Sequence, residues 1–180
     1  MKRVSLLDAV SYTTARIEYH NLEVETYIST DNLLPNKQGV IEASQLPSSI
    51  LNTPKYVKNN ILVSNIRPYL KKIYYAITEG GVSSDVLTFV VNEKYHPKFI
   101  FYSLFQDTFF EHMMAGSKGT KMPRGDKQQI LDFQISSFNF SEQQKIASIL
   151  SSLDDKIELN NQLNDNLEQQ AKLLYDYWFV

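Results

Sequence analysis

The pattern of apolar and polar positions divides the chain into two parts with different periodicity. Between Leu22 and Val91, short runs rich in β-branched and aromatic residues predict strands, which span 24–28, 61–66, 72–77 and 86–91. Pro and Gly separate these runs, which predicts turns and loops between the strands. This part of the chain is therefore expected to form a mainly β lobe.

Residues 97–114 change to helical spacing, with Pro97 suited to the first position of a helix. Mostly apolar side chains recur along one side of it, namely Ile100 or Phe101, Leu104, Phe105, Thr108, Phe109 and Met113. An aromatic stripe of this kind can serve as a stacking surface, but at helical spacing it is typical of a core. We expect one helix that packs on the sheet.

From Ser141 onward the chain contains no Gly or Pro, and apolar residues recur at alternating spacings of three and four, which predicts one long helix. The run Ser141–Gln144 predicts a capping box, in which the hydroxyl of Ser141 and the side chain of Gln144 bond each other's backbone amides. The seam of this helix repeats in heptads. Its positions are Ile146, Leu150, Leu153, Ile157, Asn160, Asn164, Leu167, Ala171, Leu174 and Trp178.

At about 1.5 Å per residue this helix is roughly 55 Å long, which is more than a small domain covers unaided. Its apolar stripe predicts a partner helix. Asn160 and Asn164 within the seam lower stability but fix register and partner number; the alternative is that they lie on a frayed, exposed face. Lys and Arg are too scarce here to favour a membrane surface.

The formal net charge of −2 conceals two regions of opposite sign. Residues 1–140 carry 15 basic and 13 acidic side chains, whereas residues 141–180 carry 3 and 7. The segment 55–78 contains no acidic residue, so it either follows a phosphate backbone or protects a strand edge. Its basic residues are Lys55, Lys58, Arg67, Lys71 and Lys72.

The segment 115–127 contains three glycines, one proline and four basic residues against one acid. Gly lets a backbone approach a ligand closely, and Lys118, Lys121 and Arg124 supply charge and hydrogen-bond donors. Contact with phosphates or base edges is one interpretation, and a flexible surface loop is the other. The spacing differs from that of an ATPase phosphate loop, so nucleotide hydrolysis is not predicted.

Residues that the chain lacks exclude several kinds of chemistry. The absence of cysteine excludes disulfides, thiolate metal sites and cysteine nucleophiles, and fits a reducing cytoplasm. The sequence contains no run of about 18 apolar residues, so it predicts no membrane-spanning helix. The three histidines do not have the spacing of metal ligands. No adenine-methylation motif occurs, and Asp85 with Glu93 and Lys94 matches a nuclease motif poorly. We expect no catalytic residue, metal or cofactor.

Ordered runs of the tail carry a family resemblance, with SEQQKIA at 141–147, LDDKIELN at 153–160, LEQQA at 167–171 and LYDYWF at 174–179. The chain resembles the specificity subunit of type I restriction–modification systems, in which such a helix follows a target recognition domain. The front of the chain is similar to that domain through ILVSNIRP at 61–68, SSD at 83–85 and GSKGTKMP at 116–123. One departure is Asn59–Asn60, where the family often has Gly-Asp.

The resemblance implies an α+β fold, with a mainly β target recognition domain and packed helices over 1–140 and one coiled-coil dimerisation helix over 141–180. It implies sequence-specific binding of double-stranded DNA that directs adenine methylation and cleavage by a methyltransferase subunit and a restriction subunit. Family members usually contain two such domains and two helices, so this chain would be a half subunit or a fragment. A homodimer through antiparallel tail helices predicts a palindromic, split DNA site.

Residue type assigns the expected contacts with DNA. Phosphate contacts are expected from Lys55, Lys58, Lys71, Lys72 and Lys127. Base-edge contacts are expected from Ser64, Asn65, Arg67, Ser84, Lys118, Thr120, Lys121 and Arg124. Two alternatives remain at this point: a coiled-coil adaptor whose β lobe binds protein, and an autonomous nuclease, which needs a carboxylate metal cluster that the sequence does not show.

Overall fold

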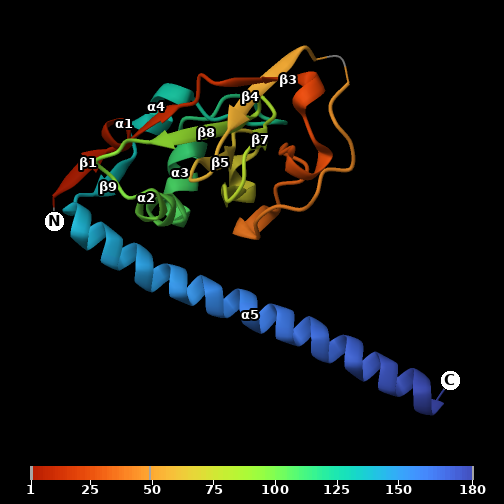
Figure 1. Ribbon diagram of the computed structural model, residues 1–180. Helices are drawn as coiled ribbons and strands as arrows, with labels where there is room; N and C mark the ends of the chain where they lie inside the picture. The colour runs from red at the N-terminus through yellow and green to blue at the C-terminus, as the bar shows by residue number, and fades with distance from the viewer. Residues whose placement is uncertain (1, 49, 180) are drawn as a thin grey trace.

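The computed structural model describes residues 2–48 and 50–179 and has the expected α+β architecture, with β-sheets and short helices followed by one long helix (Figure 1). The strands are β1 (Arg3–Ser5), β2 (Val10–Tyr12), β3 (Arg16–Glu18), β4 (Asn52–Tyr56), β5 (Ile61–Ser64), β6 (Ile73–Tyr75), β7 (Gly80–Gly81), β8 (Val86–Val91) and β9 (Gln134–Ser136). The α-helices are α1 (Leu6–Ala9), α2 (Pro97–Leu104), α3 (Asp107–Ala115), α4 (Lys127–Leu131) and α5 (Phe140–Phe179). Single 3₁₀ turns are η1 (Tyr19–Asn21), η2 (Val24–Thr26), η3 (Pro35–Lys37) and η4 (Pro68–Leu70).

The central sheet is antiparallel and has the strand order β2-β8-β5-β6. All four residues of β5 are buried, because the sheet is covered on both faces at this strand. Ile61 and Val63 belong to one apolar cluster, whereas Leu62 belongs to a second cluster with Leu33 and Tyr56. Double-sided burial explains why β5 is continuously apolar rather than alternating. The remaining strands form the pair β1-β9 and the sheet β3-β4-β7.

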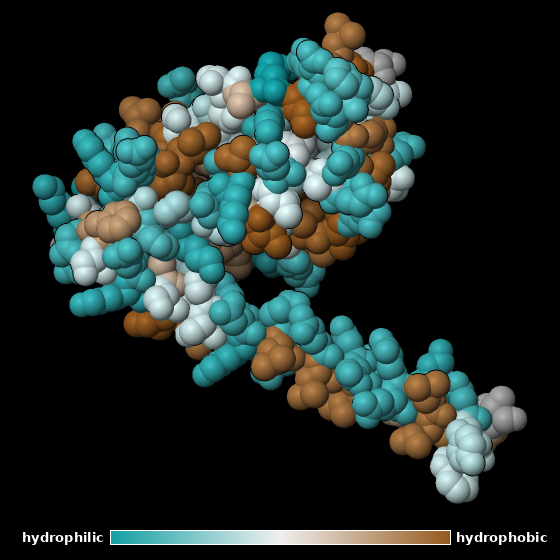
Figure 2. All heavy atoms as spheres, in the orientation of Figure 1, coloured by the Kyte–Doolittle hydropathy of each residue, from teal (hydrophilic) through white to brown (hydrophobic). Residues whose placement is uncertain are grey.

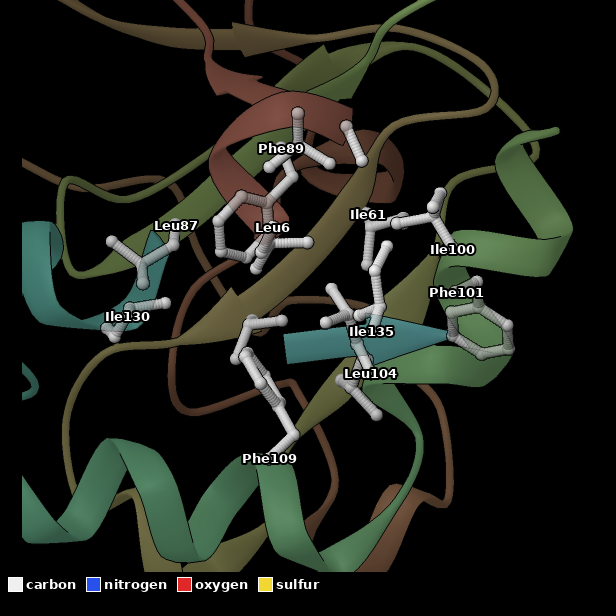
Figure 3. Close-up of a cluster of buried hydrophobic side chains, with 14 of the residues drawn as sticks. Leu6, Ile61, Leu87, Phe89, Ile100, Phe101, Leu104, Phe109, Ile130 and Ile135 are labelled. Atoms are coloured by element: carbon white, nitrogen blue, oxygen red, sulfur yellow. The ribbon is translucent and has the colours of Figure 1, made fainter. Parts of the chain in front are cut away.

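The first cluster holds the aromatic stripe that the sequence placed in the core (Figure 3). Ile100, Leu104, Phe109 and Met113 are fully buried there, which confirms the core interpretation for them, whereas Thr108 is exposed. The prediction of one continuous helix over 97–114 is wrong, because α2 and α3 are separated at Phe105 and Gln106. Gln106 has extended backbone angles and turns the chain, so that both short helices bury their apolar sides.

The predicted strands agree with the structure to different degrees. β8 has the predicted bounds of 86–91, whereas β5 and β6 are shorter than predicted. The predicted strand at 24–28 is wrong: the chain forms η2, and only Ile28 makes a β-bridge, with Val82. Tyr27 and Ile28 are buried in two different clusters, so tertiary packing overrides the local β preference.

The turn before β5 forms with Asn residues in place of the family's Gly-Asp. Asn59 has a φ of 74°, in the left-handed region that Asn tolerates better than most residues. The Oδ1 atom of Asn60 accepts a hydrogen bond from the backbone amide of Val57 at 2.9 Å, which closes the turn. Asn59 and Asn60 therefore form a closed turn before β5.

The long helix α5 begins one residue earlier than predicted, so the predicted capping box Ser141–Gln144 is wrong. The Oδ1 atom of Asn139 accepts from the amide of Glu142 at 2.9 Å, and the Glu142 carboxylate accepts from the amide of Asn139 at 3.0 Å. The same reciprocal arrangement therefore occurs two residues upstream. It satisfies two backbone donors where the helix starts.

Only the first turns of α5 contact the rest of the chain. Ala147 is buried in the first cluster, and the buried Gln143 side chain accepts from the backbone amide of His96 at 2.8 Å. Every residue from 152 to 179, here called the outer tail, is exposed. Figures 1 and 2 show this helix extending away from the other elements, with apolar side chains recurring along it. Within the described residues, no helix has the length and apolar character needed to cross a membrane.

Candidate nucleic-acid interface

Three segments that are distant in sequence meet at one end of the central sheet. Ser64 ends β5 and pairs with Val86 at the start of antiparallel β8, so residues 64–67 and 83–85 emerge together. Residues 116–126 join them, because the amide of Arg67 donates to the carbonyl of Pro123 at 2.8 Å. We call the segments 64–67, 83–85 and 116–126 the strand-end surface.

The glycine-rich segment is anchored on this surface rather than loosely attached. Lys118 and Arg124 exchange two backbone hydrogen bonds of 2.9 Å, which close a small loop between them. The amide of Gly125 donates to the carbonyl of Asn65 at 3.1 Å. A Cβ atom at Gly125 would lie 2.9 Å from both Asn65 Oδ1 and Ile130 Cδ1, so a larger residue here would force these side chains to shift.

Six of the side chains expected to contact base edges are exposed on this surface. They are Arg67, Ser84, Lys118, Thr120, Lys121 and Arg124. Two ion pairs hold members of the set: Lys118 with Asp126 at 3.1 Å and Arg124 with Asp85 at 3.1 Å. Backbone amides of Gln128 and Gln129 also donate to Asp126, and these bonds together with Lys118 lower its pKa.

The prediction of base-edge contact is wrong for Ser64 and Asn65. Their exposed fractions are 2% and 9%, too small for side chains that reach into a DNA groove. The Ser64 hydroxyl donates to the carbonyl of Ile66 at 2.9 Å. Asn65 bonds through its backbone to Asp85 and Gly125. Both residues therefore position the surface from beneath it.

Lys71 and Lys72 lie at the same end of the sheet but are partly engaged. Lys71 and Lys37 both bind the carboxylate of Asp107, with N–O distances of 2.8 and 2.6 Å. Hydrogen bonds from Lys37 and Lys71 lower the pKa of Asp107 to about 2. The Nζ atom of Lys72 donates to the carbonyl of Thr30, and burial lowers the pKa of this lysine.

The basic residues of 55–78 do not form one phosphate track, which corrects the grouping made from the sequence. Lys58 lies in the turn before β5, at the opposite end of that strand from Arg67. Lys55 is on β4 and pairs with Glu79 at 3.3 Å. The strand between Lys58 and Arg67 separates these charges along the sheet, although they are close in sequence.

Lys127 begins α4, directly after the strand-end surface, and is exposed. Its Nζ atom lies 5.9 Å from the ring centroid of Tyr12, and its carbonyl accepts from the Tyr12 hydroxyl at 2.9 Å. Burial of Tyr12, followed by the charge of Asp126, raises the pKa of this phenol. Lys127 therefore lies beside the strand-end surface with its side chain exposed.

Sequence reasoning missed the carboxylates that organise these cations. Asp85 appears in the Ser83–Asp85 run that carried the family resemblance, but no pattern linked it to Arg124, which is 39 residues away. Asp107 is 36 residues from Lys71 and 70 from Lys37. Contacts over such separations leave no periodic signal in one sequence.

The geometry does not support the nuclease alternative. Asp85 precedes β8 and Glu93 follows it, so the strand separates the two carboxylates. A polar hollow of about 570 Å³ borders the strand-end surface and is lined in part by Asp31, Glu42 and Asp85. Among residues 2–48 and 50–179, however, no group of three or more His, Asp or Glu side chains is placed to hold a metal ion.

The seam predicted on the long helix is divided between two environments. Ile146 and Leu150 are half-buried against the chain's own helices and strands, where Ile146 packs on the first cluster. These two positions serve the domain itself rather than only a partner. The remaining seam residues are exposed, and they are Leu153, Ile157, Asn160, Asn164, Leu167, Ala171, Leu174 and Trp178.

Comparison with known proteins supports the assignment suggested by the sequence runs. The HindI type I restriction enzyme specificity subunit of Haemophilus influenzae is 30% identical over 192 residues, covering 99% of this chain and 40% of that protein. The MjaIX specificity subunit of Methanocaldococcus jannaschii is 31% identical over 83 residues, covering 46% of this chain and 19% of that protein. This chain therefore spans less than half the length of either relative.

Solved structures show the same fold. The HsdS subunit of Thermoanaerobacter tengcongensis superposes with a TM-score of 0.66 at 18% identity, over 96% of this chain and 46% of that one. The type I S subunit of M. genitalium gives a TM-score of 0.63 at 19% identity, over 98% and 44%. Residues 14–169 match the type I restriction modification DNA specificity domain. This match covers most of the sequence, and the chain belongs to that family.

Proposed function

We propose that this chain is the non-catalytic DNA-recognition subunit of a type I restriction–modification complex. The observation that carries the proposal is the convergence of Arg67, Lys118, Lys121 and Arg124 on one anchored surface, in a chain that belongs to the specificity-domain family. Exposed cations on a rigid support suit both phosphate and base-edge contact. The chain would act in the cytoplasm, without a metal or cofactor of its own.

The two parts of the chain would have different roles. Residues 1–140 form the target recognition domain, and residues 141–180 form the dimerisation and spacer helix. Phosphate contacts come from Lys71 and Lys127 beside the strand-end surface. Base-edge contacts come from the exposed residues of that surface, where Arg67, Lys118, Lys121 and Arg124 carry the longest donors.

Two copies of the chain would associate through their outer tails. Leu153, Ile157 and Leu167 are each at least half exposed, and such a stripe is stabilised by burial against another helix. An antiparallel pair relates the recognition domains by a two-fold axis and supports a palindromic, split site. Two copies would also supply the second domain and helix that longer family members contain within one chain.

Methylation of adenine and cleavage would come from partner subunits. One similar solved structure, which superposes with a TM-score of 0.66, is described as addressing complex assembly and conformational transition of the type I system. We propose that a methyltransferase subunit and a restriction subunit join this chain in the same way. The double-stranded DNA site would then be chosen by this chain alone.

The proposal is tested by co-expressing the chain with the methyltransferase subunit from the same source and mapping methylated adenines in the host DNA. A new split palindrome supports both DNA specificity and two-fold pairing. New methylation at an asymmetric site contradicts the homodimer but not DNA recognition. A stable complex with the methyltransferase that binds DNA weakly and without salt dependence contradicts DNA recognition, and favours the adaptor function.

A further inference from the structure

Arg124 is the most firmly held cation of the strand-end surface. Its backbone amide and carbonyl both bond to Lys118, and it forms a β-bridge with Ile66. The residues on either side are also fixed, because Pro123 accepts from Arg67 and Gly125 donates to Asn65. The Arg124 backbone is therefore an extension of the central sheet. Thr120 and Lys121 lie in the small loop that Lys118 and Arg124 close.

A carboxylate fixes the direction of the Arg124 side chain. Its Nη2 atom lies 3.1 Å from Asp85 Oδ1 and 3.3 Å from Asp85 Oδ2. The carbonyl of Asp85 accepts from the amide of Asn65 at 2.8 Å, so the same strand end supports both partners. The Arg124 side chain remains 58% exposed, and only Nη2 contacts Asp85. The remaining N–H donors of the guanidinium are available to an external ligand.

The base that fits a fixed, exposed guanidinium is guanine. Guanine presents the acceptors O6 and N7 side by side in the major groove, and the planar fork of Arg donates to both. Lys118 and Lys121 lack this fork and offer point charges instead. Arg67 is exposed, but no carboxylate among the described residues holds it within ion-pair distance. Arg124 alone in this set combines a fixed backbone with an oriented fork.

We propose that Arg124 recognises a guanine in the major groove and that Asp85 is its positioning residue. This inference rests on the proposed DNA recognition and names the base that one side chain reads. Asp85 limits the rotamers of Arg124 before DNA binds, so less side-chain freedom is lost on binding. If a cytosine is adjacent, the exposed edge of the Asp85 carboxylate also suits its N4 amino group.

The test uses the full chain in complex with its methyltransferase subunit, after the wild-type site has been mapped. Methylation rates are measured on duplexes in which each guanine of the site is replaced in turn by adenine or by 7-deazaguanine, which lacks the N7 acceptor. The variants are Arg124→Ala, Arg124→Lys and Asp85→Asn. Arg16→Ala is the matched control, because Arg16 is an exposed arginine held by Asn52 on another sheet.

One guanine in each half-site is expected to respond. With the wild-type chain, replacing this guanine by 7-deazaguanine slows methylation about 10- to 100-fold. With Arg124→Ala, the same replacement leaves the methylation rate unchanged. Arg124→Lys keeps the salt dependence but loses most of the discrimination between guanine and adenine. Asp85→Asn loses several-fold of the same discrimination with an unchanged melting temperature, and Arg16→Ala behaves as wild type.

Two results would overturn the inference while leaving DNA recognition intact. One is a wild-type site at which no guanine responds to 7-deazaguanine. The other is an unchanged base preference in Arg124→Ala and Arg124→Lys. If Asp85→Asn lowers the melting temperature but leaves base preference unchanged, the ion pair only stabilises the fold and the positioning role of Asp85 is wrong. Failure of the wild-type complex to select any site contradicts the proposed function itself.

Discussion

The strand-end surface and the outer tail both expose many side chains, but they are held in different ways. On the surface, backbone bonds from Gly125 to Asn65 and from Arg67 to Pro123 join segments far apart in sequence. In the outer tail beyond Asp154, the side-chain hydrogen bonds between described residues connect residues four apart, from Gln162 to Glu158 and from Gln170 to Asn166. The surface is thus completed by the chain itself, whereas the tail presents a stripe that only another molecule can cover.

The largest effect is expected on dimer formation, when a charge is placed on the seam of the outer tail. Leu167→Lys is expected to raise the dissociation constant of the dimer by at least about 100-fold, because a two-fold interface loses the burial of two leucines at about 1.5–3 kcal/mol each. Leu159→Lys is the matched control, since Leu159 is equally apolar and exposed but lies off the heptad seam. The oligomeric state is measured by light scattering over a dilution series.

Equal weakening by the two tail variants would contradict the heptad assignment. A wild-type chain that remains monomeric at high concentration would contradict the homodimer. The helicity of both variants is compared by circular dichroism, because Lys favours helix about as well as Leu. If the dimer is lost while the helicity is unchanged, the substitution acts on the interface and not on the folding of the helix.

The second effect concerns the anchoring of the strand-end surface. Gly125→Ala is expected to lower the free energy of unfolding by about 1–3 kcal/mol, because the new methyl group meets Asn65 Oδ1 and Ile130 Cδ1 at 2.9 Å. Thr120→Ala, an exposed change in the same loop, is expected to have little effect. Denaturant unfolding measures both variants. Similar stabilities for the two would mean that the loop moves aside easily and is not rigidly anchored.

The third effect is on the salt dependence of DNA binding, which should differ between lysines near the two ends of β5. Lys71→Ala is expected to weaken binding to every duplex alike and to reduce the slope of log affinity against log salt by about 0.9, as one lost phosphate contact does. Lys58→Ala removes the same charge at the opposite end of the strand and is expected to change the slope little. Fluorescence anisotropy over a salt series measures both. Equal slopes for the two variants would mean that the DNA does not bind at the strand-end surface.

A fourth, smaller contrast lies within the strand-end surface. Lys121→Ala is expected to relax the preference at a single base pair by about 1–3 kcal/mol, without the uniform weakening expected from Lys71→Ala. Competition binding with single-substitution duplexes measures the preference at each position. Uniform weakening by Lys121→Ala would assign this residue to phosphate contact instead.

Elements set by local pattern were predictable, and those set by distant contacts were not. β8 and the long helix follow from periodicity, because their own residues determine which face is apolar. The failure at 24–28 arises because Tyr27 and Ile28 are drawn into separate clusters. The misassigned Ser64 and Asn65 have the right chemistry for base contact, but burial removes them from solvent. Residue type reveals donors, whereas only the fold reveals their exposure.

The smallest effect concerns the junction between α2 and the outer tail, where the Tyr102 hydroxyl donates to Asp154 at 2.6 Å. Burial, and then this bond to Asp154, raises the pKa of Tyr102 from 10.0 to about 12. The neutral phenol is therefore favoured in the folded state, so its contribution to stability is complete below about pH 10 and is lost as the pH rises toward 12. Tyr102→Phe is expected to lower stability near neutral pH by about 1 kcal/mol or less.

The difference between wild type and Tyr102→Phe should shrink as the pH rises from 10 to 12, in thermal unfolding measured at closely spaced pH values. Tyr177→Phe, in the outer tail and 80% exposed, is the control and is expected to match wild type throughout. A constant difference across that range would mean that the Tyr102 hydroxyl does not tie α2 to α5. The direction of the tail would then depend on the other contacts at the start of the helix, where Gln143 and Ala147 are buried and Ile146 and Leu150 are half-buried.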